Sequence, residues 1–161
     1  MLKKIQYEGE ISKIAIFNNF IFVGSIKGNV NIYSLSSLDE VTQFLNTPNP
    51  TKITSMCLCG EKLFVGDSSG VIKVWKFSDD KIEKITGNLG GHDSFVTRMI
   101  EKDGNLYTFG MDNKFSIWNI EALSRTKTIS EIHKDGILSA EFIGNKLVTS
   151  GGDLLVKIQF P

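Results

Sequence analysis

Apolar and polar residues alternate in short stretches along this chain, and tight turns separate the stretches. The most regular section is 53–85, where Gly60-Glu61-Lys62 and 67–70 have the composition of turns. A period of two residues is typical of β-strands, whose side chains point alternately to the two faces of a sheet. We expect four antiparallel strands in this section, at 53–58, 63–65, 71–75 and 82–85.

The same order of stretches and turns occurs four times in all. Marked by a glycine, the copies stand at Gly24, Gly66, Gly110 and Gly151, in steps of 42, 44 and 41 residues. A repeat of about 40 residues, in which an aromatic residue ends an alternating stretch, predicts a four-stranded blade of a β-propeller; a repeated helix pair would show helical spacing. We expect one propeller unit over 1–161, with blades at 11–45, 53–85, 96–129 and 137–160.

The last repeat unit lacks a strand, and an additional strand-like stretch precedes the first unit. The last unit has three strand-like stretches and no fourth, while residues 2–6 stand where the outer strand of a preceding blade would lie. Pairing between them would remove two exposed sheet edges. We expect strand 2–6 to complete a blade, within the chain, in a second copy of it or with another protein.

Composition and charge narrow the function classes. Hydrophobic residues make up 41% of the 161 residues, enough to bury a core, and 18 Lys and Arg balance 18 Asp and Glu. A net charge of zero creates no field that attracts nucleic acid or an anionic membrane. The N-terminal residues lack the apolar run of a signal peptide, and no stretch approaches the roughly 18 apolar residues of a membrane span. We expect an intracellular protein, cytoplasmic rather than nuclear.

Several of these residues resemble the WD-repeat β-propeller family, whose units carry a Gly-His pair, a turn with Ser and Asp, and a Trp at the end of the third strand. The third unit has His92, Asp112 and Trp118 at matching places. In the fourth unit, His133 and Asp153 keep the same separation of 20 residues. The resemblance implies a structural hydrogen-bond network that includes seven side chains: His92, Asp112, Trp118, His133, Ser150, Asp153 and Trp75.

Departures from the family pattern indicate where this network is incomplete. Phe109 stands at the Ser place of the third unit, Gln159 at the Trp place of the fourth, and the first two units have no His. We therefore expect no unit to contain the whole network. Rings of this family usually have seven or eight blades. The resemblance thus implies an all-β WD-repeat propeller of four blade equivalents, half of a larger or shared ring; four blades closing alone would need a sharper angle.

Candidate catalytic groups have a simpler structural explanation. His92 with Asp112 has the residue types of a general base and the acid that orients it. The same pair recurs as His133 with Asp153, and a pair that recurs with the repeat is typical of scaffolding. We therefore expect no enzymatic activity and no catalytic residue.

Candidate metal and phosphate sites are equally incomplete. Cys57 and Cys59 are spaced so that both thiols point to one face of a strand, but the further ligands of a metal site are missing. The glycines of 87–91 lack the Lys and Ser or Thr of a phosphate-binding loop and precede no helix, so we expect a connecting loop. We predict no cofactor and no metal.

Partners of the resembling family commonly bind the loops that enter the first strand and those that join the second and third. Segment 46–50, with two prolines, occupies the loop that holds His92 in the third unit, and we expect a variable loop there rather than a binding peptide. Phe95 is the most suggestive position, because an aromatic residue beside the Gly91-His92 loop can anchor an interface. The alternative is a Phe95 buried at the start of its strand. The matching positions, which we expect to form a partner-binding face, are Lys27, Asn29, Ser69, Asp93, Ser94, Phe95, Met111, Lys114 and Asp135.

Two functions fit this sequence. The first is a non-enzymatic scaffold or adaptor that binds proteins or peptides in a larger complex, with a second copy of the chain as one candidate partner. The second is a WD-repeat subunit associated with nucleic acid or ribonucleoprotein, for which Lys3, Lys4 and Lys13 could supply a local basic patch. The balanced charge favours the first.

Overall fold

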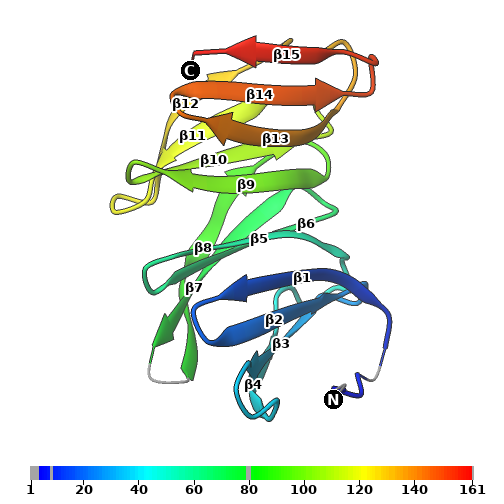
Figure 1. Cartoon of the computed structure of the whole chain (residues 1–161), viewed down its shortest axis with the longest axis vertical. Helices are drawn as coiled ribbons and strands as arrows, with labels where there is room; N and C mark the ends of the chain where they lie inside the picture. Colours follow the sequence, from blue (N-terminus) through cyan, green and yellow to red (C-terminus); the bar gives the residue numbers. More distant parts are fainter. Residues whose placement is uncertain (1–3, 8, 79–80, 161) are drawn as a thin grey trace.

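The computed structural model describes residues 4–7, 9–78 and 81–160, and these form strands, turns and loops (Figure 1). No helix among them is long and apolar enough to cross a membrane. The strands are β1 (Ile11–Phe17), β2 (Phe20–Ser25), β3 (Asn29–Ser34), β4 (Glu40–Leu45), β5 (Ile53–Cys59), β6 (Lys62–Asp67), β7 (Val71–Ser78), β8 (Lys81–Gly91), β9 (Val96–Lys102), β10 (Asn105–Gly110), β11 (Phe115–Asn119), β12 (Ser124–Ile129), β13 (Ile137–Ile143), β14 (Lys146–Gly151) and β15 (Val156–Gln159).

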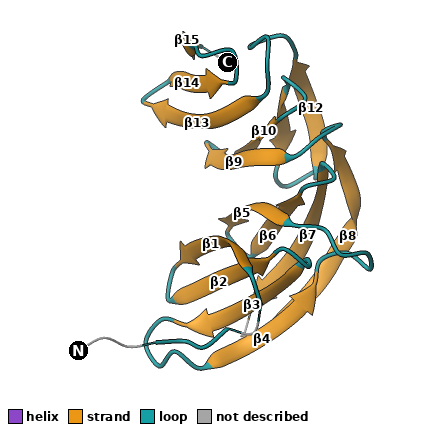
Figure 2. Cartoon of the chain, turned by 90° about the vertical axis from the view of Figure 1, so that its right-hand side faces the viewer, coloured by secondary structure: helices purple, strands orange, loops and turns teal. Residues whose placement is uncertain are grey.

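Strands that follow one another in the sequence pair to form antiparallel sheets, and each sheet is one blade. Blade 1 is β1 to β4, blade 2 is β5 to β8, blade 3 is β9 to β12, and blade 4 has the three described strands β13 to β15. The first hairpin of every blade turns through a residue of positive φ, at Asn18, Gly60, Asp103 and Gly144. The sheets stack face to face in an open arc, with blades 1 and 4 at its two ends (Figure 2). The all-β prediction is therefore confirmed.

The hydrophobic core lies between blades, because each inner sheet buries both of its faces. Between blades 1 and 2, Phe22 and Ile32 pack with Met56 and Leu63. Similar clusters centred on Phe64 and Phe109 fill the next two junctions. Full burial of an aliphatic or aromatic side chain contributes roughly 1.5–3 kcal/mol, so these clusters hold the arc together.

Strand register corrects the phase of the repeat. The ladder between the first two strands of each blade places Ser25, Asp67, Gly110 and Gly151 at equivalent positions, in steps of 42, 43 and 41. Counting by glycine was wrong by one residue in the first two units, where Gly24 and Gly66 have a different role. A Cβ on Gly24 would lie 2.7 Å from the Ile53 side chain of the next blade.

Two further sequence predictions were wrong. Residues 4–6 of the expected strand 2–6 are not in a strand, and its first two residues lie outside the described part of the chain. The glycine-rich segment 87–91 is the end of β8 rather than a loop. It can pair with β7 because Gly91 has no Cβ: one would collide with the carbonyl oxygen of Gly70, in the turn directly before β7.

Candidate functional site

One edge of the arc is built from the turns between the second and third strands and the segments that lead into the first strands. We call this edge the rim. In every blade a turn amide donates to a carbonyl of the entering segment, at 2.9–3.1 Å. The four donor and acceptor pairs are Ile26 and Glu10, Ser68 and Lys52, Met111 and Phe95, and Gly152 and Gly136.

Blade 3 contains a complete chain of side-chain hydrogen bonds beneath the rim. His92 Nδ1 lies 2.8 Å from Asp112 Oδ1, His92 Nε2 lies 3.0 Å from Thr108 Oγ1, and Trp118 Nε1 donates to Thr108 Oγ1 at 3.0 Å. An indole N–H only donates, so the Thr108 hydroxyl accepts from it and gives its proton to His92 Nε2. His92 therefore carries its proton on Nδ1 and donates it to Asp112. Every buried side-chain group of this blade 3 network has a hydrogen-bond partner.

Blade 4 repeats part of this chain. His133 Nδ1 lies 2.8 Å from Asp153 Oδ1, and His133 Nε2 lies 2.9 Å from Thr149 Oγ1. Gln159 occupies the tryptophan place, and its buried side-chain nitrogen has no hydrogen-bond partner among the described residues. Beside it, the Lys157 ammonium donates to the Ile132 carbonyl.

The hydroxyl of the network was misplaced by one residue. Thr108 and Thr149 bond the histidines, whereas Ser150 and Phe109 occupy the neighbouring register position on the opposite face of the sheet. The physical reason is the strand period of two, which turns a one-residue error into the wrong face. The expectation that no unit has the whole network was therefore wrong for blade 3.

Blade 2 has an asparagine where blade 3 has the histidine of its hydrogen-bond network. The Asn46 amide donates to Gly28 O at 2.9 Å, as the His92 amide donates to Gly70 O at 3.0 Å, so the two residues have equivalent places. Trp75 Nε1 donates to Asn46 Oδ1 at 3.0 Å, and the Lys73 ammonium donates to Asn46 O at 2.5 Å. Burial lowers the pKa of Lys73, with a smaller effect from Lys84.

The glycine at the end of the second strand decides which arrangement a blade adopts. A Cβ on Gly110 would collide with the His92 ring, and one on Gly151 would lie 2.5 Å from the His133 ring. In blade 2 this position is Asp67, whose buried carboxylate accepts from Ser69 N at 2.8 Å and from Thr51 Oγ1 at 3.2 Å. A histidine in the entering segment and a side chain at this position thus exclude each other.

Acid should weaken the blade 4 network through Asp153. Burial opposes its ionisation, but the Lys134 amide, His133 and the Leu155 amide together hold the pKa of Asp153 at about 2, below its ordinary 3.8. A lowered folded-state pKa means that the stabilisation is present above about pH 4 and is lost as the pH falls through 2.

Asp153→Asn should therefore lower the melting temperature at pH 7. The difference in melting temperature between this variant and the wild type should be smaller at pH 2.5. Asp39→Asn, on an exposed turn of blade 1, is the control and should change neither value. An Asp153→Asn difference that stays constant with pH would contradict this account.

The predicted partner-binding positions all lie on the rim turns or entering segments, and most are exposed. Blades 3 and 4 bring several of them together. Lys114 Nζ bonds Asp93 Oδ2 at 2.6 Å and lowers the pKa of that carboxyl, and Met111 packs beside Gly136 at the start of blade 4. By contrast, Lys27, Asn29 and Ser69 stand on the separate turns of blades 1 and 2. Most of the predicted positions that contact one another therefore lie on blades 3 and 4.

Two apolar residues of this region were missed. Leu154 is 95% exposed and Leu155 is 49% exposed, both in the turn between β14 and β15. Leu154 has φ +65°, like Asn113 of the preceding blade's turn, a conformation that leucine rarely adopts. The available signal was an apolar pair inside a turn that has at most one apolar residue in each of the other units.

The two cysteines follow the packing prediction. Their sulfur atoms lie 3.7 Å apart on one face of β5, with Cys57 buried in the junction of blades 2 and 3. The hydrogen bond to Cys57 and burial raise the pKa of Cys59, so its thiol stays protonated. Among the described residues, no group of three or more Cys, His, Asp and Glu is placed to hold a metal ion.

Solved structures with this arrangement of blades are WD40 propellers. The chain aligns with the U3-55K structure at a TM-score of 0.81 and 19% identity, over 98% of this chain and 50% of that one. It aligns with RRP9 WD40 repeats at 0.80 and 19% identity, over 96% and 49%. The computationally designed Ika4 protein matches over 99% of both chains at 0.82 and 16% identity. The chain has the WD40 fold.

Curated relatives by sequence are much longer proteins, and no family model matches. The 66 kDa stress protein of Physarum polycephalum is 22% identical over 92% of this chain and 25% of its own length. Myosin heavy chain kinase C of Dictyostelium discoideum is 28% identical over 74% and 15%. The putative E3 ubiquitin-protein ligase LIN-1 of Lotus japonicus is 37% identical over 41% and 5%. The chain thus spans a quarter or less of these relatives, and the WD40 fold is what the comparisons establish.

Proposed function

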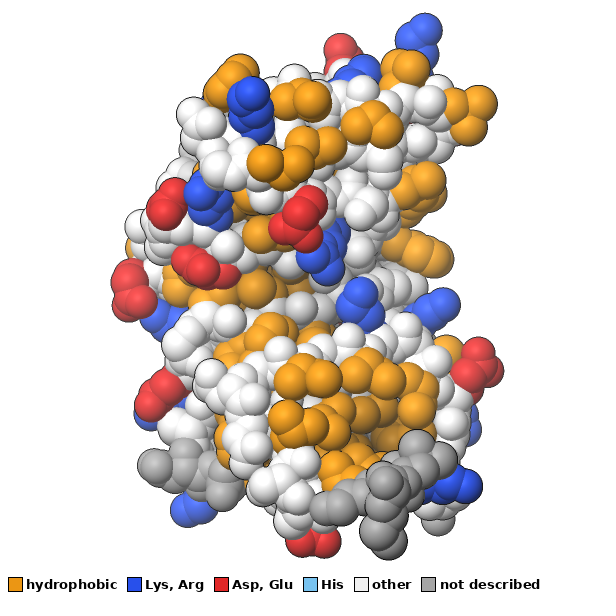
Figure 3. All heavy atoms as spheres, viewed as in Figure 1, with side chains coloured by type: hydrophobic (Ala, Val, Ile, Leu, Met, Phe, Trp, Pro, Cys, Tyr) orange, Lys and Arg blue, Asp and Glu red, His pale blue; other side chains and the backbone are white. Residues whose placement is uncertain are grey.

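We propose that this WD40 chain is a non-enzymatic scaffold or adaptor that binds a protein or peptide through the rim over blades 3 and 4. The observation that carries the proposal is a row of exposed apolar side chains on that rim. Phe95 is 48% exposed, Met111 is 38% exposed and Leu154 is almost wholly exposed. Apolar side chains protrude from the corresponding edge in Figure 3 (right, upper half). Exposed aromatic and Met side chains are typical anchors of protein interfaces.

The row is held by rigid backbone. The Met111 amide donates to Phe95 O, the Gly152 amide donates to Gly136 O, and the histidine networks lie directly beneath these turns. Ordering a flexible loop costs binding free energy, so turns that are already ordered can bind more tightly with the same contacts. This support also gives the buried histidines a role: they fix the surface that binds.

Charged groups border the apolar row. The pair of Asp93 and Lys114 lies on one side, and Asp135 stands on the segment that enters blade 4. An apolar centre with a charged rim is the usual anatomy of a protein interface. Nothing comparable favours nucleic acid, since the charged groups named here include two acidic residues and one basic residue, and the whole chain has no net charge. The cytoplasmic location stays a prediction.

Affinity capture tests this proposal. Wild-type chain should recover a defined set of proteins from a lysate of the source cells, and Phe95→Glu or Leu154→Glu should reduce that recovery at least tenfold, which corresponds to about 1.4 kcal/mol. Leu35→Glu is the matched control, because Leu35 is an exposed leucine of blade 1 that lies beside the hairpin of β1 and β2, away from the rim. Equal recovery with all variants would contradict the proposed site. Retention of the wild type on a nucleic-acid column at low salt, lost in Lys13→Glu, would favour the alternative function.

A further inference from the structure

The outer face of blade 1 consists of positions that are buried in every other blade. Ile11 is 44% exposed, whereas the residues at its place in blades 2, 3 and 4 are fully buried. Ile14 is 55% exposed, and its equivalents Met56, Met99 and Ala140 are at most 6% exposed. The equivalents are buried because the preceding blade covers them. Blade 1 therefore exposes the face that, in each of the other blades, packs against the preceding blade.

The outer face of blade 4 exposes the positions that are covered by the following blade in the inner blades. Val156 and Ile158 are 70% and 65% exposed, while their counterparts in the third strands of the other blades are at most 9% exposed. Ile143, Leu138 and Phe160 extend this apolar surface. In the inner blades the following blade covers these positions. Blade 4 thus presents the face that meets a blade of the opposite kind.

The two faces are complementary halves of the junction that the chain already makes three times. Each inner junction joins a face of the blade 4 kind to a face of the blade 1 kind, with fully buried residues on both sides. Within one chain the two unpaired faces lie at opposite ends of the open arc and cannot meet (Figure 2). Apolar side chains gather over the free face of blade 1 in Figure 3. A contiguous apolar surface of this kind marks an interaction site.

We propose that a second copy of this chain covers both faces and closes the ring. Blade 4 of each copy packs on blade 1 of the other, which creates two identical junctions related by a twofold axis. Continuity with the inner junctions identifies the occupant, because a second copy carries both kinds of face. The curvature agrees: nearly the whole chain superposes on about half of the U3-55K and RRP9 WD40 chains. A net charge of zero imposes no repulsion between copies.

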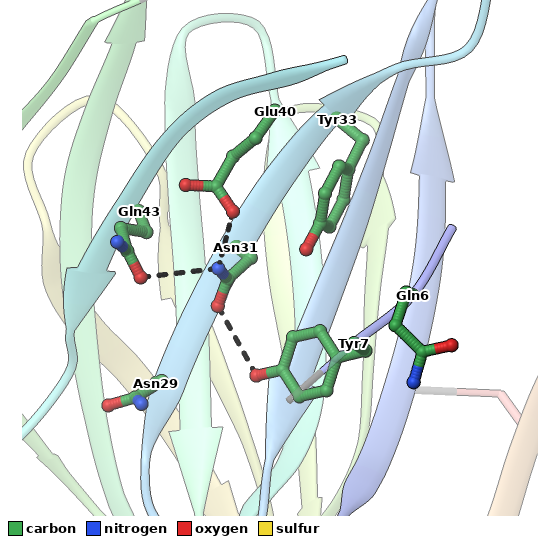
Figure 4. A pocket seen from close by; sticks show the side chains of 7 residues that line it. All are labelled: Gln6, Tyr7, Asn29, Asn31, Tyr33, Glu40 and Gln43. Atoms are coloured by element: carbon green, nitrogen blue, oxygen red, sulfur yellow. Dashed lines mark hydrogen bonds between the residues drawn. The ribbon is translucent and has the colours of Figure 1, made fainter. Parts of the chain in front are cut away.

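Residues 4–7 define how far the second copy reaches. The inner half of the blade 1 face, formed mainly by β1 and β2, is apolar, and the outer half is formed mainly by β3 and β4. The inner half contains a hollow of about 370 Å³, lined by residues that include Ile14, Ile16 and Ile21. The outer half is polar (Figure 4), where the Tyr7 hydroxyl bonds Asn31 Oδ1 at 3.2 Å and Asn31 Nδ2 donates to Glu40 at 2.9 Å. Ile5 and Tyr7 also line the apolar hollow, so the N-terminal segment lies at the boundary between the two halves. The incoming blade therefore packs on the apolar half, beside this segment.

Light scattering coupled to size exclusion tests the proposal. The wild-type chain should elute at twice its 17.9 kDa mass. Ile14→Lys on blade 1 and Ile158→Glu on blade 4 should each give a folded monomer, because each removes both junctions of the ring. Leu35→Lys is the control and should remain dimeric. Circular dichroism checks that the variants fold, which the exposure of Ile14 and Ile158 leads us to expect.

Mixing the two variants gives the decisive measurement. One Ile14→Lys chain and one Ile158→Glu chain share one unaltered junction and one with opposite charges, so the mixture should form a heterodimer that neither variant forms alone. A monomeric wild type, a dimer that survives both substitutions, or a mixture that stays monomeric would each overturn the proposal. The rim is a different surface, so loss of capture by Phe95→Glu and loss of dimers by Ile14→Lys report separately.

Discussion

Replacing Gly70 by alanine should lower the free energy of unfolding by about 3 kcal/mol, one of the two largest effects expected in this chain. Gly70 has φ +88°, and a Cβ there would overlap the His92 carbonyl group and lie 2.8 Å from Ser94 O. These are backbone atoms, which cannot rotate away as a side chain can. The substitution would also separate the His92 amide from Gly70 O, its partner at 3.0 Å.

Gly60→Ala is the matched control for this prediction. Gly60 also has positive φ, +59°, but a Cβ there would meet nothing within 4 Å. The conformational cost alone is about 1 kcal/mol. Urea unfolding of both variants measures the difference, which should appear in the midpoint with an unchanged slope. Equal destabilisation by the two substitutions would show that the contact with the His92 backbone does not matter.

The second large effect should come from His92, and its dependence on Gly110 should be visible in a double-mutant cycle. His92→Ala leaves Asp112 and Thr108 without their buried partner, which should cost about 3 kcal/mol. Gly110→Ala forces a methyl group against the His92 ring and the Asp112 carboxylate, and overpacking of this kind costs about 2 kcal/mol. The double variant should lose about 2 kcal/mol less than the sum, because the small side chain at 92 leaves room for the methyl group.

Blade 1 supplies the comparison for this cycle. Ser25 stands at the place of Gly110, in a blade with no histidine partner among the described residues, and its hydroxyl accepts from Lys27 N at 3.2 Å and from Asn29 N at 3.0 Å. Ser25→Ala should therefore cost only about 1 kcal/mol and should be additive with His92→Ala. Strict additivity of Gly110→Ala with His92→Ala would contradict the mutual exclusion of histidine and side chain.

These effects connect the buried network to the proposed binding surface. Asp112 accepts from the Asp93 amide at 2.9 Å, so the network reaches the same loop that carries the Asp93–Lys114 pair and Phe95. A blade that loses His92 keeps its strands through the core but loses a fixed rim. Binding at Phe95 should consequently weaken in His92→Ala even where the variant remains folded.

The sequence by itself determined the number of blades, their strand order and the histidine and aspartate pairs. These features depend on local patterns: alternation with period two, turn residues that accept positive φ, and a fixed spacing of 20 residues. The resemblance to WD repeats also placed Phe95 and Met111 on the rim, where the structure has them. The register of the second strand was beyond such patterns, because Ser150 and Thr149 are both short hydroxyl residues and only pairing shows which one faces the histidine.

Tertiary structure alone decided the rest. That Asn46 takes the place of a histidine follows from a backbone bond to Gly28, a residue 18 positions away, and no local pattern records it. The sequence predicted an incomplete ring, but it does not show which side chains the two uncovered end faces expose. Ile14 reads as a core position there, just as Met56 does, because the same alternation produces both. Whether such a residue is buried depends on a neighbouring blade, and that is a property of the arc rather than of the strand.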